Sequence, residues 1–437
     1  MNQMKYYSTR NKKEKASLKE AVMRGLAPGG GLYMPVEIPV LRRGELEEIR
    51  NLDLTGIAVL LSQKLFGDDL PNSELADIAA DAVHFDTPVV KVEKGCYALE
   101  LFHGPTLAFK DVGARFMARM LGIFTRGLNR PIHVLVATSG DTGSAVANGF
   151  LGVEGVQVHV LYPSGGVSSL QEKQFSTLNG NITALEVDGT FDDCQKLVKD
   201  AFSDDTIRSR MILTSANSIN LARFLPQAFY YFRGWNQVPA ESPVISVPSG
   251  NFGNLTAGFI AREMGLPVHQ FIAACNANDV VPEYLETGAF RPRPSIATIA
   301  NAMDIGNPSN FERILDLFGN RHEHLIHHLA GYSYNDTNIR EIIHQVYHET
   351  GYLCDPHGAT GYEALRQYRL SHPDSTGIFF ETAHPAKFSE VVEEETGTPV
   401  SVPERLANFA QREKQSIPLD NTYTAFREYL AEAAEKK

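Results

Sequence analysis

The chain has 437 residues, of which 43% are hydrophobic, so it can bury a large core and form two or three domains. Its 52 acidic and 40 basic residues give a formal net charge of −12, which argues against general binding to nucleic acid or to an anionic membrane surface. No apolar run is long enough to cross a bilayer, and the first residues lack the apolar core of a signal peptide. The four cysteines form no CxxC pair, so we expect a cytoplasmic protein without a disulfide framework or a zinc ribbon.

Residues 1–95 mix short helical patterns with glycine and proline. Ser17, followed three residues later by Glu20, has the pattern of a capping box and predicts a helix through Met23. A turn is expected at the Pro-Gly-Gly-Gly sequence of residues 28–31. We expect the segment to be largely helical and to pack on a larger domain.

The segment LFHGPTLAFKDVGARFMARML has Lys110 near its centre. From Val112 onward the apolar side chains recur at helical spacing, so Lys110 is expected at or just before the start of a helix. An amine held between apolar side chains near a helix N-terminus has its charged form disfavoured, as a Schiff-base-forming lysine requires. The alternative is a solvated lysine in the first helical turn.

Strands and helices alternate after this segment. The β-branched run of residues 132–137 predicts a strand, and residues 144–150 predict a helix. The pattern repeats with strands at 156–162 and 183–187 around a helix near 170–178. It predicts a mostly parallel sheet covered by helices, with ligands at the carboxyl ends of the strands. The polar loop after the first strand consists of Thr138, Ser139, Gly140, Asp141 and Thr142.

A second loop follows the expected strand 244–248 and precedes a helix expected over 255–264. Its glycines allow close backbone approach to an anion, and the helix N-terminus directs N–H groups at that anion. The pattern is neither GxGxxG nor a P-loop, so it indicates only a phosphate or a carboxylate, and a plain strand-to-helix turn is the alternative. The residues of this loop are Gly250, Asn251, Phe252, Gly253 and Asn254.

Two further segments carry polar side chains. Thr382 follows the apolar strand expected over 377–380, where a hydroxyl is either a simple cap or a ligand group. His324 and His328 are spaced i, i+4, but the HExxH order is absent, so we expect no metal site there.

Several blocks of the sequence together resemble one family. They occur in that family's order, from near residue 1 to near residue 400, and they are HGPTLAFKD, ATSGDTGSA, LQEKQ with NGNI, TSANSINLARFLPQ, PSGNFGN, NANDVVPEYL, IANAMDIGNPSNFER, DPHGATGY and ETAHPAKF. The chain resembles the threonine synthases of the shorter, non-plant branch, which belong to the β-family of pyridoxal-5′-phosphate (PLP) enzymes.

The resemblance implies an α/β protein with two open, twisted, mostly parallel sheets, in the tryptophan-synthase-β-like (fold-type II) architecture with an N-terminal extension. We expect the extension at 1–95 and a small α/β domain with the Schiff-base lysine at 96–235. The large α/β domain, with the phosphate loop and the C-terminal helices, is expected at 236–437.

The resemblance also implies roles for single residues. Lys110 would anchor PLP and carry protons, residues 250–254 would bind the cofactor phosphate, and Thr382 would hydrogen-bond the pyridine nitrogen. The loop 138–142 would hold the substrate carboxylate, although Asp141 stands where many β-family enzymes have asparagine. The substrate phosphate is expected to contact Lys173, Asn217, Asn220 and Arg223, although a lysine and an arginine on amphipathic helices are often solvated.

The implied reaction converts O-phospho-L-homoserine and water to L-threonine and phosphate. Another β-family lyase or dehydratase is the first alternative, but the chain lacks an SxGNHG-type loop, and residues 401–437 have the pattern of a charged surface helix rather than a regulatory domain. The second alternative is a catalytically silent homologue. The chain retains Lys110, the loop 250–254 and Thr382, which argues against that alternative. The sequence leaves monomer and homodimer open.

Overall fold

The computed structural model describes residues 6–435, and no helix in that range is long and apolar enough to span a membrane. The chain forms two compact units, each built from separated segments. The six-stranded unit contains residues 34–109 and 224–402, and the five-stranded unit contains the described residues up to 33, residues 110–223 and the described residues from 403. Two short elements span the boundaries: β3 (Tyr33–Pro35) and α10 (Leu221–Phe224).

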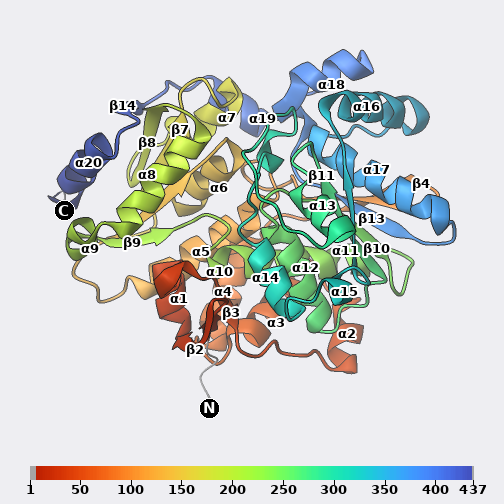
Figure 1. Ribbon diagram of the computed structural model, residues 1–437, viewed down its shortest axis with the longest axis horizontal. Coiled ribbons are helices and arrows are strands. Elements are labelled where there is room, and N and C mark those ends of the chain that lie inside the picture. Colours follow the sequence, from red (N-terminus) through yellow and green to blue (C-terminus); the bar gives the residue numbers. More distant parts are fainter. Residues whose placement is uncertain (1–5, 436–437) are drawn as a thin grey trace. The chain divides into compact units, whose positions relative to one another are not determined.

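The sheet of the six-stranded unit is parallel except for its last strand, which pairs antiparallel with its neighbour (Figure 1). In spatial order its strands are β12 (Leu329–Ser333), β11 (Gln270–Cys275), β10 (Val244–Pro248), β13 (Gly377–Glu381), β5 (Cys96–Glu100) and β4 (Val89–Glu93). Every residue of β10 and β13 is buried, so helices cover both faces of the sheet.

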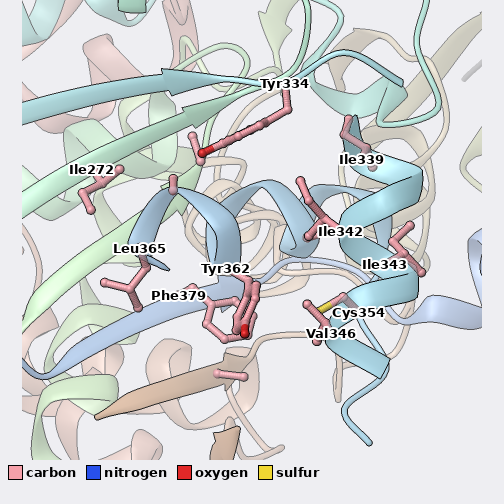
Figure 2. Close-up of a cluster of buried hydrophobic side chains, with 14 of the residues drawn as sticks. Ile272, Tyr334, Ile339, Ile342, Ile343, Val346, Cys354, Tyr362, Leu365 and Phe379 are labelled. Carbon is pink, nitrogen blue, oxygen red and sulfur yellow. The ribbon is translucent and has the colours of Figure 1, made fainter. Parts of the chain in front are cut away.

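One core cluster of this unit lies between the sheet and two long helices (Figure 2). Ile339, Ile342, Ile343, Tyr362 and Leu365 belong to this cluster, and these five residues are buried. The helices of the unit are α2 (Arg43–Ile49), α3 (Leu54–Phe66), α4 (Asn72–Ala82), η2 (Leu225–Gln227), α11 (Ala228–Asn236), α12 (Gly253–Glu263), α13 (Val280–Thr287), η3 (Asn301–Met303), α14 (Phe311–Leu317), α15 (His322–Leu325), α16 (Asp336–Thr350), α17 (Pro356–Ser371), η4 (Pro385–Phe388) and α18 (Ser389–Thr396).

The sheet of the five-stranded unit is entirely parallel. In spatial order its strands are β14 (Ser416–Asp420), β8 (Ile182–Asp188), β7 (Val156–Pro163), β6 (Ile132–Ala137) and β9 (Ile212–Ser215), preceded in the chain by the antiparallel pair β1 (Tyr6–Ser8) and β2 (Asn11–Ala16). Its helices are α1 (Leu18–Arg24), η1 (Pro28–Gly30), α5 (Lys110–Phe124), α6 (Asp141–Phe150), α7 (Ser169–Ser176), α8 (Phe191–Ser203), α9 (Asp205–Arg210), α19 (Glu404–Ala410) and α20 (Tyr423–Glu435).

The predicted α/β architecture with parallel sheets is confirmed. The strand expected at 132–137 has those bounds, and α1 begins after Ser17, whose capping box with Glu20 is formed. The helix expected to begin near Lys110 begins at that residue.

Several elements were not predicted, among them two strands at the ends of the sheets. The C-terminal segment, expected to be a surface helix, also contains β14, which pairs parallel with β8 and lengthens the sheet. The segment 1–95 ends in β4, which pairs with β5. The units are discontinuous, whereas the expected domains follow one another; the expected boundaries after 95 and after 235 stay a prediction.

Candidate active site

The segment before Lys110 runs beside the strand end that carries Thr382. The Phe109 N–H donates to the carbonyl of Thr382 at 2.9 Å, and the His384 N–H donates to the carbonyl of Leu107 at 3.1 Å. Ala108 and Ala383, between these pairs, form an antiparallel bridge. The backbone of Phe109, the residue just before Lys110, is therefore hydrogen-bonded to the backbone of Thr382.

The same segment is held in one conformation. Leu107 has φ of 58°, a left-handed backbone that costs a non-glycine residue on the order of 1–3 kcal/mol and that clusters at functional sites. The buried Lys387 ammonium donates to the carbonyl of Thr106 at 2.8 Å, and the Tyr230 hydroxyl donates to the carbonyl of Phe109 at 2.6 Å. These bonds from outside the segment offset the strain.

Lys110 is the first residue of α5 and is partly buried. The buried side chains that follow it include Val112, Phe116 and Met117, the apolar stripe that the sequence predicts. The predicted position at a helix start is thus confirmed, and the Schiff-base role stays a prediction.

The loop at residues 250–254 joins β10 to α12. Phe252, the N-cap of α12, has a left-handed backbone (φ 61°, ψ 13°), and no side chain caps the helix. The Leu255 N–H in the first turn is taken by Asn254 Oδ1 at 2.9 Å, so an anion here would be held by the earlier N–H groups of the turn and by the helix dipole. Because the loop contains no lysine or arginine, it would hold that anion through the backbone.

Two asparagine side chains brace this loop. Asn251 Oδ1 accepts from the Ser309 N–H at 2.7 Å. Asn254 Nδ2 donates to the carbonyl of Pro248 at 2.7 Å, and its Oδ1 accepts from the Ser249 hydroxyl at 3.1 Å. The side chains shape the loop, which leaves anion binding to its N–H groups.

The other predicted loop follows β6 and opens α6. Thr138 Oγ1 accepts from the N–H groups of Gly140 (2.9 Å) and Gly143 (2.7 Å), so this hydroxyl shapes the turn. No side chain caps α6 at Gly140. Asp141 is buried, and its Oδ1 accepts from Gln171 Nε2 at 2.9 Å. Ser139 and Thr142 lie in the same turn and are partly buried.

Gln171 contacts the loop 138–142 and was not among the predicted residues. It is 1% exposed, and a Cβ on Gly140 would come within 2.8 Å of its Cδ. The block LQEKQ contains Gln171, but a cation suits phosphate better than an amide does, so the sequence favours Lys173 in this block.

Two predicted asparagines lie near the same end of the sheet. Asn217 Nδ2 donates to the carbonyl of Ala137, the last residue of β6, at 3.1 Å. Asn220 Nδ2 donates to the carbonyls of Val22 (2.8 Å) and Ser215 (3.1 Å). The amide hydrogens of Asn220 are therefore engaged in holding α1.

The two predicted cations differ in setting. Arg223 is 2% exposed, and its Nη1 donates to the carbonyl of Ala216 at 2.7 Å. A Cβ on Gly113 would lie 2.3 Å from the Arg223 carbonyl oxygen, so the arginine backbone packs on the first turn of α5. Lys173 Nζ donates to the carbonyl of Ala410 at 2.5 Å and is directed to the C-terminal segment.

The histidine-rich segment contributes to packing. A ring nitrogen of His322 bonds the Leu285 carbonyl at 2.9 Å, and the ring of His328 packs against Phe318. Within residues 6–435, no group of three or more potential ligands could hold a metal ion.

Comparison with known proteins defines the class first. Residues 82–380, which include Lys110 and the loop 250–254, match the family described as "Pyridoxal-phosphate dependent enzyme". Together with the parallel α/β sheets, this match defines a PLP-dependent enzyme of fold-type II.

Further matches cover both ends of the chain. Residues 5–83 match "Threonine synthase N terminus", and residues 358–430 match "Threonine synthase, C-terminal". The chain is 44% identical to threonine synthase from Haemophilus influenzae, over 98% of this chain and 99% of that protein.

Solved structures agree with these matches. The crystal structure of threonine synthase from Escherichia coli has a TM-score of 0.92 at 42% identity and covers 98% of this chain and 100% of that chain. PLP-bound threonine synthase from Brucella melitensis has a TM-score of 0.92 at 32% identity and covers 99% of this chain and 100% of that chain. The chain belongs to the threonine synthase family.

Proposed function

We propose that this chain catalyses the PLP-dependent conversion of O-phospho-L-homoserine and water to L-threonine and phosphate, the last step of threonine biosynthesis. The observation that carries the proposal is the hydrogen bond between the Phe109 N–H and the carbonyl of Thr382, because it joins the approach to Lys110 to the strand end that carries the predicted ring ligand. Family matches along the whole chain support the same reaction.

The residues of the site fit PLP. The first N–H groups of α12, whose N-cap residue Phe252 makes no side-chain cap bond, suit the cofactor phosphate. When bound, PLP supplies an electron sink that makes C–H bonds near the substrate amino group acidic. Lys110 would hold the cofactor covalently and carry protons on its Nζ, and the Thr382 hydroxyl would bond the pyridine nitrogen.

The loop 138–142 would bind the substrate carboxylate. In the first turn of α6 the Thr138 hydroxyl takes the Gly143 N–H, so the anion would be held by the N–H groups of Asp141 and Thr142, joined by the hydroxyls of Ser139 and Thr142. Gln171, bonded to Asp141, would keep the aspartate carboxylate from turning toward that anion.

The substrate phosphate needs a positive, donor-rich pocket on a protein of net charge −12. Arg223 would supply its charge from a backbone fixed against α5, and Asn217 would add an amide donor. Lys173 would reach the phosphate only by leaving the Ala410 carbonyl, to which its Nζ donates. Asn220 would support them indirectly through Val22 and Ser215.

The proposed location is the cytoplasm, which the four free, buried cysteines support because a reducing compartment keeps thiols unpaired.

Product analysis tests the reaction. Purified protein with PLP should release phosphate from O-phospho-L-homoserine and form an equal amount of L-threonine, identified by chiral chromatography. A dehydratase would give a 2-oxo acid and ammonia from threonine or serine instead. A silent homologue would bind PLP and release no phosphate.

Cofactor attachment tests the lysine. The holoenzyme should be yellow, and borohydride reduction followed by peptide mapping should find the cofactor on Lys110. A reduced cofactor on another lysine would contradict the assignment.

A further inference from the structure

A buried carboxylate–imidazole pair lies at the start of α17 and has no part in the proposed reaction. Asp355 and His357 are 0% and 2% exposed, and Asp355 Oδ1 lies 2.5 Å from His357 Nδ1. Asp355 also caps α17, accepting from the N–H groups of His357 (2.8 Å) and Gly358 (3.3 Å). Moving such a pair out of water costs free energy, and the hydrogen bonds of the pair must offset that cost.

The hydrogen bonds fix the tautomer of the imidazole. The Ala302 N–H donates to His357 Nε2 at 3.2 Å, so this nitrogen accepts and carries no proton. The ring proton is then on Nδ1, where it is donated to Asp355. Burial works to raise the pKa of Asp355, but His357, a hydrogen bond with Glu381 and the His357 N–H outweigh burial and lower it, so the carboxylate stays ionised.

Ala302 connects the pair to the phosphate loop. It is the middle residue of η3, and η3 packs directly against Gly250: a Cβ added there would lie 2.5 Å from Met303 Cα and 3.1 Å from the Ala302 oxygen. A shift of η3 would therefore move the first residue of the loop.

Asp355 also reaches the strand end that carries Thr382. Its N–H donates at 3.3 Å to Oε2 of Glu381, the residue just before Thr382. A Cβ on Gly358 would lie 2.0 Å from Glu381 Oε1, so this carboxyl is closely packed. Burial, and then the charge of Asp355, raise the pKa of Glu381 well above its usual value, so Glu381 is a neutral acid beside an ionised one.

We propose that Asp355 and His357 are positioning residues for the cofactor cradle: His357 Nε2 holds the backbone of Ala302, which sets Gly250, and Asp355 holds the imidazole. This inference rests on the proposed function, because it assumes that the loop 250–254 binds the PLP phosphate. It assigns no contact with PLP or substrate to either residue.

Two amide substitutions separate the two sides of the imidazole. In His357→Gln the side-chain oxygen can reach the place of Nε2 and accept from Ala302. In His357→Asn the shorter amide can replace Nδ1 and donate to Asp355, but it leaves the buried Ala302 N–H without its acceptor. Each variant is the other's control, since both are neutral and polar.

The measurements are the PLP dissociation constant of the apoenzyme, from absorbance titration, and the ³¹P chemical shift of the bound cofactor phosphate. Leaving a buried donor unsatisfied corresponds to roughly 5-fold to 150-fold in an equilibrium constant. We expect His357→Asn to bind PLP at least about 10-fold more weakly, with a changed ³¹P shift. His357→Gln should stay within about threefold of the parent, with the parental shift. Equal losses in both variants, or no loss in His357→Asn, would overturn the proposal.

A second measurement needs no variant. In holoenzyme with ¹⁵N-labelled histidine, the His357 ring should show a bare Nε2 and a protonated Nδ1, and a protonated Nε2 would overturn the proposal. The tests use no substrate, so a parent protein that binds PLP but forms no threonine would fail only the proposed reaction. A parent protein that binds no PLP would refute both.

Discussion

Gly140 shows how one residue can shape the substrate loop. Its φ of 139° is accessible to glycine and strained for any other residue, and its Cα faces the buried side chain of Gln171. The turn that it forms directs the start of α6 at the predicted carboxylate site.

Gly140→Ala should therefore cost both stability and substrate binding. The new Cβ would press on Gln171, which is itself bonded to Asp141. We expect a loss of roughly 1–3 kcal/mol in the free energy of unfolding, together with a raised KM. The control is Gly152→Ala, which also has positive φ (75°) but has no atom within 4 Å of the added Cβ. It should lose stability and keep its KM, and equal KM values for both variants would contradict the prediction.

Substitution of Thr382 tests whether its hydroxyl faces the pyridine nitrogen of PLP, as the proposed chemistry requires. A threonine hydroxyl leaves the pyridine nitrogen mostly neutral, whereas an aspartate would keep it protonated and strengthen the electron sink. Thr382→Asp should still bind PLP, form threonine at least about 10²–10³-fold more slowly, and give more racemised or transaminated product.

The control for this prediction is Thr382→Ser, which keeps a hydroxyl and should retain most activity. Chiral chromatography of the products is the measurement. Threonine formation by Thr382→Asp near the parental rate would show that Thr382 does not face the ring nitrogen.

Among the elements, α20 is joined to the sheet of the five-stranded unit by a chain of polar side chains. His133 of β6 bonds His159 of β7 at 3.0 Å, and His159 bonds the Tyr429 hydroxyl of α20 at 2.7 Å. Burial lowers the pKa of His133 to about 4, and burial with the neighbouring histidine lowers that of His159 to about 3. Both rings are therefore neutral in the folded protein.

The two buried, neutral histidines predict that the protein loses stability in mild acid. Because both pKa values are lower in the folded state than in the unfolded state, unfolding takes up protons below about pH 6.5. The stabilisation is complete above that pH and is lost as the pH falls toward 4, by up to about 1.4 kcal/mol per pH unit for each histidine. Urea unfolding from pH 7.5 to 5 measures the slope. His133→Asn should reduce it, and an unchanged slope in that variant would contradict the assignment.

Elements with local signals could be predicted, and elements that depend on distant partners could not. The position of Lys110 follows from the helical spacing after it, and β6 follows from its β-branched run. In contrast, β14 has a short, partly polar sequence and becomes a strand by pairing with β8, more than two hundred residues earlier. The link from His357 to Ala302 joins residues 55 apart and has no local signature.

At the scale of the whole molecule, the C-terminal segment completes the five-stranded unit. Leu419 of β14 and Phe426 and Leu430 of α20 are buried in one cluster with residues of β6, β7 and β8. Without that segment, β8 would become an open sheet edge, and apolar surface would be exposed.

Removal of residues 411–437 should therefore destabilise the five-stranded unit. Hydrogen exchange by mass spectrometry should show faster exchange in peptides from β8 and α8 than in peptides from β10 and β11. Removal of residues 431–437 alone keeps Leu430 and is the matched control. Equal exchange in the two truncated proteins would show that β14 and most of α20 are dispensable.

The discontinuity of the two units has a consequence for biosynthesis. Residues 224–402 finish a unit that begins at 34, and the segment from 403 finishes the other. The last strand of the six-stranded unit, β13, ends at residue 381, and the last strand of the five-stranded unit, β14, ends at residue 420. A ribosome that adds ~5–20 residues per second needs roughly 20–80 s to reach these strands, and neither sheet is complete before then. The nascent chain must carry one edge of β8 unpaired for about half of translation, and one edge of β10 unpaired until β13 is made. The yield of this protein in the cell should therefore depend on chaperones that bind exposed strands before synthesis ends.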